Sequence, residues 1–175
     1  MLDLKIQPDA LRRVGLKSIE LITIRTLAGR DANNAPFAPY STEPFARPLG
    51  GITARARAAL GETGLKIFKT RGGHLWAVIT GGYRALKAAS NPQDGPAVNM
   101  SATGAMLRAL TIINVNAGAR TVSIGFSRGE EAIKAYWHNV TGVGRQHTIR
   151  KFMGVAPSEQ PTLAAIAAEG ITIKT

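Results

Sequence analysis

The chain has 175 residues, a net charge of +11 and no cysteine. This length is enough for one substantial domain and short for two independent cores. The missing cysteines exclude disulfides, thiolate nucleophiles and zinc–thiolate sites. No apolar run approaches the length of a membrane span, and Asp3, Lys5 and Asp9 interrupt the N-terminal apolar residues. We therefore expect a soluble, unprocessed protein with no membrane partner.

The basic charge is concentrated in one part of the chain. Residues 44–90 contain eight basic residues and one acid, Glu62, a local excess of +7. Such a surface attracts a polyanion or an acidic protein in a salt-dependent manner. The glycine pairs at 72–73 and 81–82 favour an extended basic insertion or arm at 44–95, within a single domain of residues 1–175. A regular hairpin packed on the main sheet is the alternative.

The N-terminal part predicts a strand followed by a long helix. Apolar and polar residues alternate over 2–7, which indicates a short strand. Pro8 and a broad apolar stripe predict a helix to about Ala28, ended by Gly29. We expect its basic residues on the solvated face; they are Arg12, Arg13, Lys17 and Arg25.

The middle of the chain is less regular. Proline, asparagine and two aromatics over 30–41 predict a turn-rich loop pinned to the core. An Ala- and Arg-rich segment at 52–62 predicts a short helix, and residues 65–80 a hairpin. Residues 83–90 are ambiguous, and 91–95 predict a loop.

The C-terminal part predicts helices alternating with strands. The expected elements are a helix at 103–110, strands at 111–116 and 120–126, helices at 127–141 and 158–169, and an edge strand at 171–174. Ser101 and Ser127 are expected N-caps, and Glu130 and Glu131 suit the first turn of the second helix. These elements predict an α+β fold, with a small, mostly antiparallel sheet and helices packed on one face.

The sequence contains no catalytic constellation. His74, His138 and His147 form no pair at helical spacing and have no nearby carboxylate cluster, so we expect no metal site. Glu130 and Glu131 are adjacent and point to different helix faces, which is unsuitable for a shared acid–base site. Phosphate-loop patterns are absent. A G-x-S-x-G pattern occurs once, as G-F-S-R-G at 125–129, and by itself it does not make a catalytic triad. We therefore expect neither enzymatic activity nor a cofactor.

The basic charge also suggests an alternative function, that of a nucleic-acid-binding accessory protein. None of the known groove-entering signatures occurs. Aromatics interleaved with basic residues could stack on single-stranded bases, although packing inward or at a subunit contact explains them as well. These aromatics are Phe68, His74, Trp76 and Tyr83.

Five short motifs between residues 30 and 160 carry a resemblance. They are F-A-P-Y-S at 37–41, V-N-M-S-A-T-G-A-M-L-R-A-L at 98–110, I-G-F at 124–126, A-I-K-A-Y-W-H-N at 132–139, and R-K-F-M-G-V at 150–155 before Ser158 and Glu159. Their order resembles that of the phage virion morphogenesis protein family, of the tail-completion and neck type. Such proteins usually have a shorter Lys/Arg-rich linker where this chain has residues 44–95.

The resemblance implies a structural subunit of the head–tail junction of a tailed bacteriophage or prophage, such as a tail completion, tail terminator or neck protein. It implies a homo-oligomeric ring, a hexamer or dodecamer, that joins or caps the tail around the DNA channel. The implied partners are neighbouring neck, portal-side or tail-tube proteins, with non-specific contact to packaged DNA. The implied location is the virion neck, after assembly in the host cytoplasm.

Ring subunits expose aromatic and apolar side chains to one another, and basic side chains suit DNA or an acidic neighbour. The candidates for subunit or partner contact are Phe37, Tyr40, Trp76, Trp137, His138, Phe152 and Met153. The candidates for DNA or an acidic partner are Arg55, Arg57, Lys66, Lys69, Arg71, Arg150 and Lys151. For Arg150 and Lys151 a solvated turn is an equal alternative, and Thr103 and Gly104 are expected to be structural.

Overall fold

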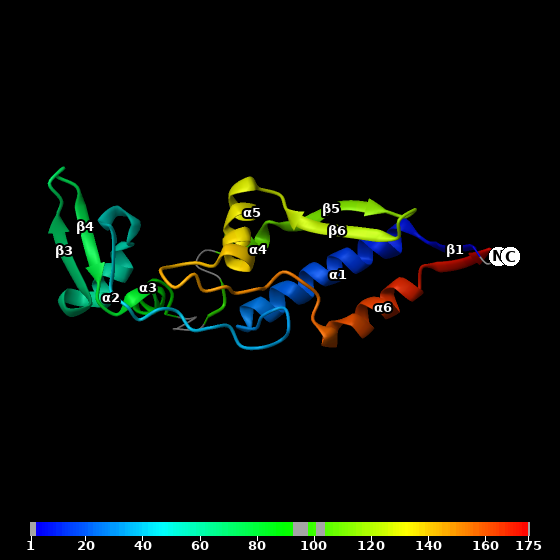
Figure 1. Cartoon of the computed structure of the whole chain (residues 1–175), viewed down its shortest axis with the longest axis horizontal. Coiled ribbons are helices and arrows are strands. Elements are labelled where there is room, and N and C mark those ends of the chain that lie inside the picture. The colour runs from blue at the N-terminus through cyan, green and yellow to red at the C-terminus, as the bar shows by residue number, and fades with distance from the viewer. Residues whose placement is uncertain (1–2, 93–97, 101–103, 175) are drawn as a thin grey trace. The chain divides into compact units, whose positions relative to one another are not determined.

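The structure, a computed structural model, describes residues 3–92, 98–100 and 104–174. The chain divides into two compact units, one formed by Met1–Phe37 with Thr103–Thr175 and the other by Ala38–Ala102. The fold is α+β, as expected (Figure 1). The described strands form three small antiparallel sheets, however, and not the one sheet that the sequence suggested.

The first unit is built on one long helix. Its helices are α1 (Pro8–Leu27), α4 (Ala105–Arg108), α5 (Gly129–Tyr136) and α6 (Gln160–Ala168). Its strands are β1 (Asp3–Ile6), β5 (Leu110–Asn116), β6 (Thr121–Phe126) and β7 (Ile171–Lys174). A π-helical turn, Trp137–Thr141, continues α5, and a 3₁₀ turn, Pro157–Glu159, precedes α6. The predicted strands and helices of this unit are confirmed, with small differences at their ends.

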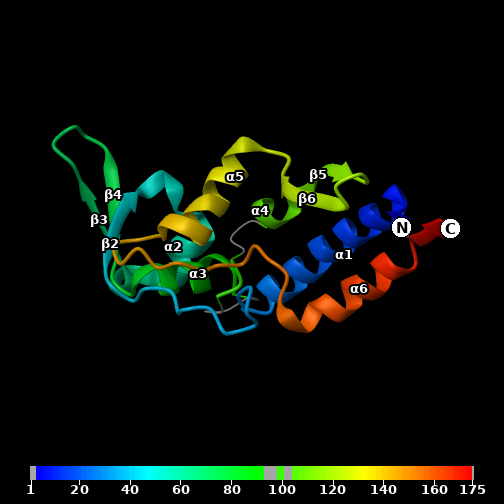
Figure 2. The ribbon, with the colours of Figure 1, turned by 45° about the vertical axis from the view of Figure 1, so that its right-hand side comes forward.

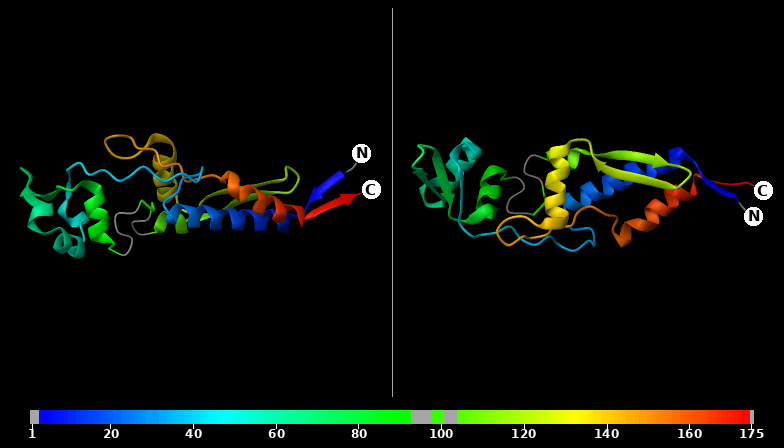
Figure 3. Two further views of the ribbon diagram at one scale, coloured as in Figure 1. Left: turned by 90° about the horizontal axis from the view of Figure 1, so that it is seen from below. Right: turned by 45° about the horizontal axis from the view of Figure 1, so that its top comes forward.

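Helix α1 packs against the β5–β6 hairpin and against α6 (Figure 2). Gly15 allows the hairpin to approach, because a Cβ at this position would lie 2.8 Å from Val122 Cγ2 and 2.9 Å from Ile112 Cδ1. Strands β1 and β7 pair antiparallel, with Lys5 opposite Thr172, so the first and last described strands lie side by side (Figure 3). The predicted C-terminal edge strand therefore pairs with the N-terminal strand.

Two details of the first unit differ from the sequence-based expectation. Ser127 does not cap α5, because its hydroxyl and its backbone N–H both donate to the carbonyl of Ala109, and Arg128 occupies the cap position. Arg25, expected on a solvated face, is buried. The expected cap at Ser101 lies outside the described residues.

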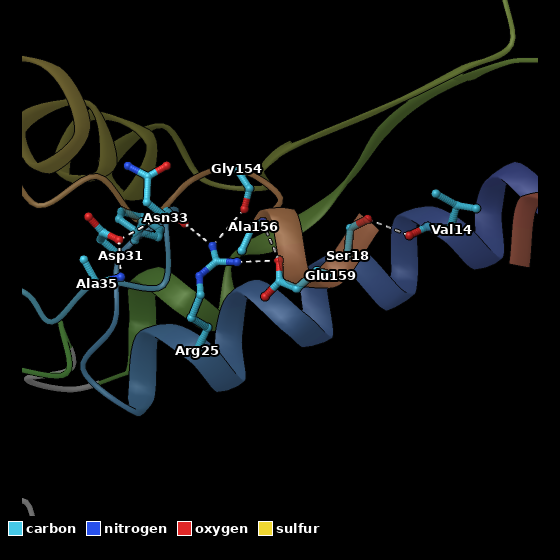
Figure 4. Close-up of polar contacts among 10 residues, drawn as sticks. Val14, Ser18, Arg25, Asp31, Asn33, Ala35, Gly154, Ala156 and Glu159 are labelled. Carbon is cyan, nitrogen blue, oxygen red and sulfur yellow. Dashed lines mark hydrogen bonds and ion pairs between the residues drawn. The ribbon is translucent and has the colours of Figure 1, made fainter. Parts of the chain in front are cut away.

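Arg25 connects α1 to the segment that leads into α6 (Figure 4). Its Nη1 donates to Glu159 Oε2, and its Nη2 donates to the carbonyls of Phe152 and Gly154, at 2.9 and 2.8 Å. Glu159 Oε2 also accepts the backbone N–H of Ala156 at 2.8 Å, which satisfies an amide at the start of the 3₁₀ turn. This buried, charge-assisted network fixes the path of residues 150–159 across the end of α1.

The second unit places two helices on a three-stranded sheet. Its strands are β2 (Phe45–Pro48), β3 (Leu65–Lys69) and β4 (Leu75–Ile79), its helices are α2 (Ala54–Gly64) and α3 (Gly82–Ser90), and a 3₁₀ turn spans Leu49–Gly51. The sheet order is β2-β4-β3, entirely antiparallel. A buried cluster fills the space between sheet and helices; it comprises Ile52, Ala56, Leu65, Ala77, Ile79, Leu86 and Ala89.

The predicted helix at 52–62 and hairpin at 65–80 are confirmed, and the ambiguous segment 83–90 is helical. Gly82, with φ +69°, leads into α3 close to the backbone of Ser41 and Thr42, where a Cβ would not fit. Residues 44–95, expected as an extended arm or insertion, thus supply most of a folded unit with its own core. The predicted loop at 91–95 lies mostly outside the described residues.

Candidate functional site

Helix α5 and the π-helical turn after it expose large apolar side chains. Glu131 and Ala135 are buried, whereas Ile133, Tyr136, Trp137 and Val140 are each 50–54% exposed. The four exposed residues are spaced i, i+3, i+4 and i+7, so they form one stripe, which we call the α5 stripe. Water-soluble helices normally place such a stripe against the core, so its exposure marks a surface suited to a partner.

A side chain at the centre of the π-helical turn holds the turn to the following segment. Asn139 Oδ1 accepts the backbone N–H groups of Phe152 and Met153, at 3.0 and 2.9 Å, and Asn139 Nδ2 donates to the carbonyl of Ala135 at 2.7 Å. The carbonyl of His138 accepts the N–H of Arg150 at 2.8 Å. These bonds fix α5 and its exposed stripe relative to residues 150–153.

His138, a predicted contact residue, lies mostly on the inner side of this helix. Burial, and secondly the positive charge of Arg150, lower the pKa of His138 to about 4. Its Nδ1 is buried and has no hydrogen-bond partner in the described part of the chain. The imidazole is therefore neutral at physiological pH, and its role is in packing.

Three predicted contact residues belong to the interior. Phe152 is fully buried, and Phe37 and Tyr40 are buried as well, which corrects their assignment as partner contacts. The ring of Tyr40 meets that of Tyr83 edge-on, with centroids 5.0 Å apart. The burial of Phe37 and Tyr40 instead confirms the other prediction for these residues, that the 30–41 loop is pinned to the core by its aromatics. Met153 is half-buried.

The two basic residues of the R-K-F-M-G-V motif have different environments. Arg150 is buried, so it does not face DNA or an acidic neighbour as predicted. Lys151 is exposed, and its carbonyl accepts the N–H of Ala32 at 2.7 Å. Alternation along the motif explains the difference, since Arg150 and Phe152 point inward and Lys151 points out.

The remaining predicted basic residues gather on the second unit. Arg55 and Arg57 are exposed on α2, and Lys66, Lys69 and Arg71 are exposed on the β3–β4 hairpin. Trp76 is half-buried on β4, opposite Phe68 of β3. The second unit thus brings five of the predicted basic residues and Trp76 together on α2 and the β3–β4 hairpin.

The described residues contain no group of three or more His, Asp or Glu side chains placed to hold a metal ion. Among the helices described, none combines the length and the apolar character needed to cross a membrane.

Comparison of the chain with models of protein families, with curated proteins and with solved structures gave no match.

Sequence reasoning did not single out the rest of the α5 stripe. Ile133, Tyr136 and Val140 continue the apolar pattern of the predicted helix at 127–141, and periodicity identifies an apolar face without saying what covers it. A usable signal was present in the sequence: the opposite face is formed by Glu131, Ala135 and His138. That face has little apolar area, yet in the structure it is the side of the helix that packs against the rest of the unit, with Glu131 and Ala135 buried.

Proposed function

We propose that this chain is a structural subunit of a tailed-phage virion at the head–tail junction, acting as a tail completion, tail terminator or neck protein. The support for this function is the order of the five motifs, which resembles that of phage virion morphogenesis proteins. The subunit acts by assembly: copies form a ring, a hexamer or dodecamer, that joins or caps the tail. It needs no catalytic residue, metal or cofactor.

The observation that carries the assembly part of this proposal is the exposed α5 stripe. Its four side chains are each about half exposed on a single chain. Covering them by a neighbouring subunit stabilises the assembly by roughly 1 kcal/mol per side chain from burial alone. A ring requires two different surfaces on each subunit, and the outer side of α1 offers a second apolar one, with Leu16, Ile24 and Leu27 exposed.

The hydrogen bonds that hold the α5 stripe in place also suit a contact surface. Asn139 and the backbone bond between His138 and Arg150 hold it rigidly, so little conformational freedom is lost on binding. In the virion, the neighbours of the ring are the neck, portal-side or tail-tube proteins, and packaged DNA is a non-specific contact. Assembly takes place in the host cytoplasm.

Negative-stain electron microscopy of the purified protein tests the proposal. We expect closed rings with a central channel. A field of small particles without a channel, at protein concentrations well above those of a phage-infected cell, would contradict it.

A further inference from the structure

Helices α2 and α3 cover one face of the sheet of the second unit except near the hairpin tip, where Ile67 and Leu75 of that face are 53% and 52% exposed. We call the other face the open face. Leu65, Ala77 and Ile79 belong to the buried cluster to which α2 and α3 both contribute. Because side chains alternate along a strand, the intervening residues lie on the opposite face. Phe68 and Trp76 are directly paired across β3 and β4, so they share that face. Phe68 is 42% exposed and Trp76 is half-buried.

Three cations belong to the same hairpin as this aromatic pair. Lys66 lies on the open face by the same alternation, whereas Lys69 follows Phe68 and lies on the covered face, and Arg71 is in the turn that joins β3 to β4. All three side chains are exposed, and they take part in none of the hydrogen bonds or ion pairs between described residues. Glu62 is the one acid among residues 44–90, against eight basic residues. The positive charges of Lys66, Lys69 and Arg71 are therefore available to a ligand.

A hollow extends the surface at the same end of the sheet. It has a volume of about 690 Å³, is open to solvent, and is lined in part by Trp76, Arg57 and His74. Trp76 thus belongs both to the open face and to the lining of this hollow, together with Arg57 and His74. The described residues of this unit therefore combine an exposed aromatic pair with nitrogen donors and cations on the same hairpin.

We propose that this surface binds single-stranded nucleic acid. Bases stack on Phe68 and Trp76, Lys66 and Arg71 meet the phosphates, and Lys69 adds positive charge at the end of the hairpin. An acidic peptide would satisfy the cations but has no planar ring faces for the aromatic pair. In a duplex the base faces are already stacked on one another, so the aromatics would be unused. This inference concerns the second unit and does not depend on the ring proposed above.

Fluorescence anisotropy with a labelled oligothymidine strand, over a series of salt concentrations, tests the charge component. Replacing the three hairpin cations, in K66Q/K69Q/R71Q, is expected to reduce the slope of log affinity against log salt by about 1.4 to 2, since about 0.7 counterion is released per phosphate contact and Lys66 and Arg71 make two such contacts. A matched control, R12Q/R128Q/R145Q, removes the same charge from exposed positions of the first unit. It should leave the slope nearly unchanged. Equal effects of the two triple variants would overturn the proposal.

Substitutions at Phe68 test the stacking component. Phe68→Leu keeps an apolar side chain but removes the ring, so we expect affinity to fall about tenfold, while Phe68→Tyr keeps the ring and binds within about twofold of the wild type. Unchanged binding by the leucine variant would contradict stacking, as would equal affinity for a duplex of the same length. Circular dichroism of both variants confirms that the unit is folded.

Tryptophan fluorescence gives a direct readout of contact. The chain has two tryptophans, Trp76 and Trp137, so a W137F protein reports Trp76 alone. We expect the oligothymidine strand to quench this emission, with a midpoint equal to that of the anisotropy titration. Binding without quenching would exclude stacking on Trp76. Ring formation can fail without altering any of these results, so the two proposals are tested separately.

Discussion

Arg25 and Glu159, separated by 134 positions in the sequence, form an ion pair in which both side chains are nearly buried, at 5% and 11% exposure. A second Arg–Glu pair, Arg13 with Glu169, also joins α1 to the C-terminal end of the chain, but its side chains are 46% and 61% exposed. The two pairs join the same parts of the chain and differ mainly in burial.

The difference in burial predicts very different effects on stability. Arg25→Met removes the cationic partner of the nearly buried Glu159 carboxylate and the donor to the carbonyls of Phe152 and Gly154, so we expect it to lower the free energy of unfolding by about 3–5 kcal/mol. Arg13→Met should lower it by at most about 1 kcal/mol, because exposed pairs contribute little. Urea denaturation followed by circular dichroism measures both. Similar losses in the two variants would show that the buried pair is not what fixes residues 150–159.

Substitution of Asn139 is expected to destabilise the first unit. Asn139→Ala removes the acceptor of two backbone N–H groups, so we expect a loss of about 2–4 kcal/mol of unfolding free energy. Asn116→Ala is the matched control, because Asn116 Oδ1 accepts a single N–H, that of Ala119, in an exposed turn. Its loss should be about 1 kcal/mol or less. An equal loss at both positions would contradict the role given to Asn139.

Gly15 tests the docking of the β5–β6 hairpin on α1. Alanine raises helix propensity by about 1 kcal/mol, but here its methyl group would collide with Ile112 and Val122, so we expect Gly15→Ala to destabilise by about 1–2 kcal/mol net. Gly129→Ala, in α5, has open space around the new methyl group and should leave stability equal or slightly higher. A stabilised Gly15→Ala protein would mean that the hairpin does not approach the helix as closely as the structure shows.

His138 predicts a dependence of stability on pH. Its pKa is lowered from 6.5 to about 4 in the folded chain, mainly by burial. Between these two values the unfolded chain binds the proton more tightly, so the free energy of unfolding falls as the pH drops from 6.5 toward 4. The ring is partly exposed, which weakens the effect, so we expect the free energy of unfolding to fall by about 1–2 kcal/mol over this pH range.

The comparison with His138→Gln isolates this effect from other titrating groups. The variant should lose less stability than the wild type on acidification from neutral pH, whereas His147→Gln, at an exposed position, should follow the wild type. Parallel stability curves for the wild type and His138→Gln would contradict the lowered pKa. Urea denaturation at several pH values between neutral and mildly acidic conditions supplies the data.

Local patterns in the sequence predicted most elements, because helix α1, the two hairpins and α6 each have a periodicity and end signals of their own. Burial of individual residues was less predictable. Arg25 has the same local pattern as the solvated Arg12 and Arg13, and only its tertiary neighbours at 152–159 distinguish it. The sequence likewise does not show that tertiary packing buries Arg150 and Phe152 of the R-K-F-M-G-V motif.

The α5 stripe could be predicted as an apolar helix face but not as an exposed one. Whether such a face is covered by the same chain depends on long-range packing, and here Asn139 and the 150–153 segment turn the opposite face inward. The open face of the second unit was suggested by aromatics interleaved with cations. The register that places Phe68 beside Trp76, and Tyr83 against Tyr40, could not be read from the spacing alone.

Substitution of the α5 stripe should abolish assembly without unfolding the chain. In Ile133→Ser/Val140→Ser, two half-exposed apolar side chains are removed, so each subunit contact loses roughly 2 kcal/mol of burial and the protein becomes monomeric. Ile113→Ser/Ile149→Ser removes two side chains of similar exposure elsewhere on the same unit and should still assemble. Assembly that survives in the stripe variant would show that another surface makes the contact.

The native mass of the purified protein, measured by sedimentation velocity, is the most direct test of whether the chain assembles with copies of itself. The ring proposal predicts a single closed species, a hexamer or dodecamer of the 18.5 kDa chain, that persists or strengthens as salt is raised, because its contacts are apolar. A monomer at every protein and salt concentration would contradict it.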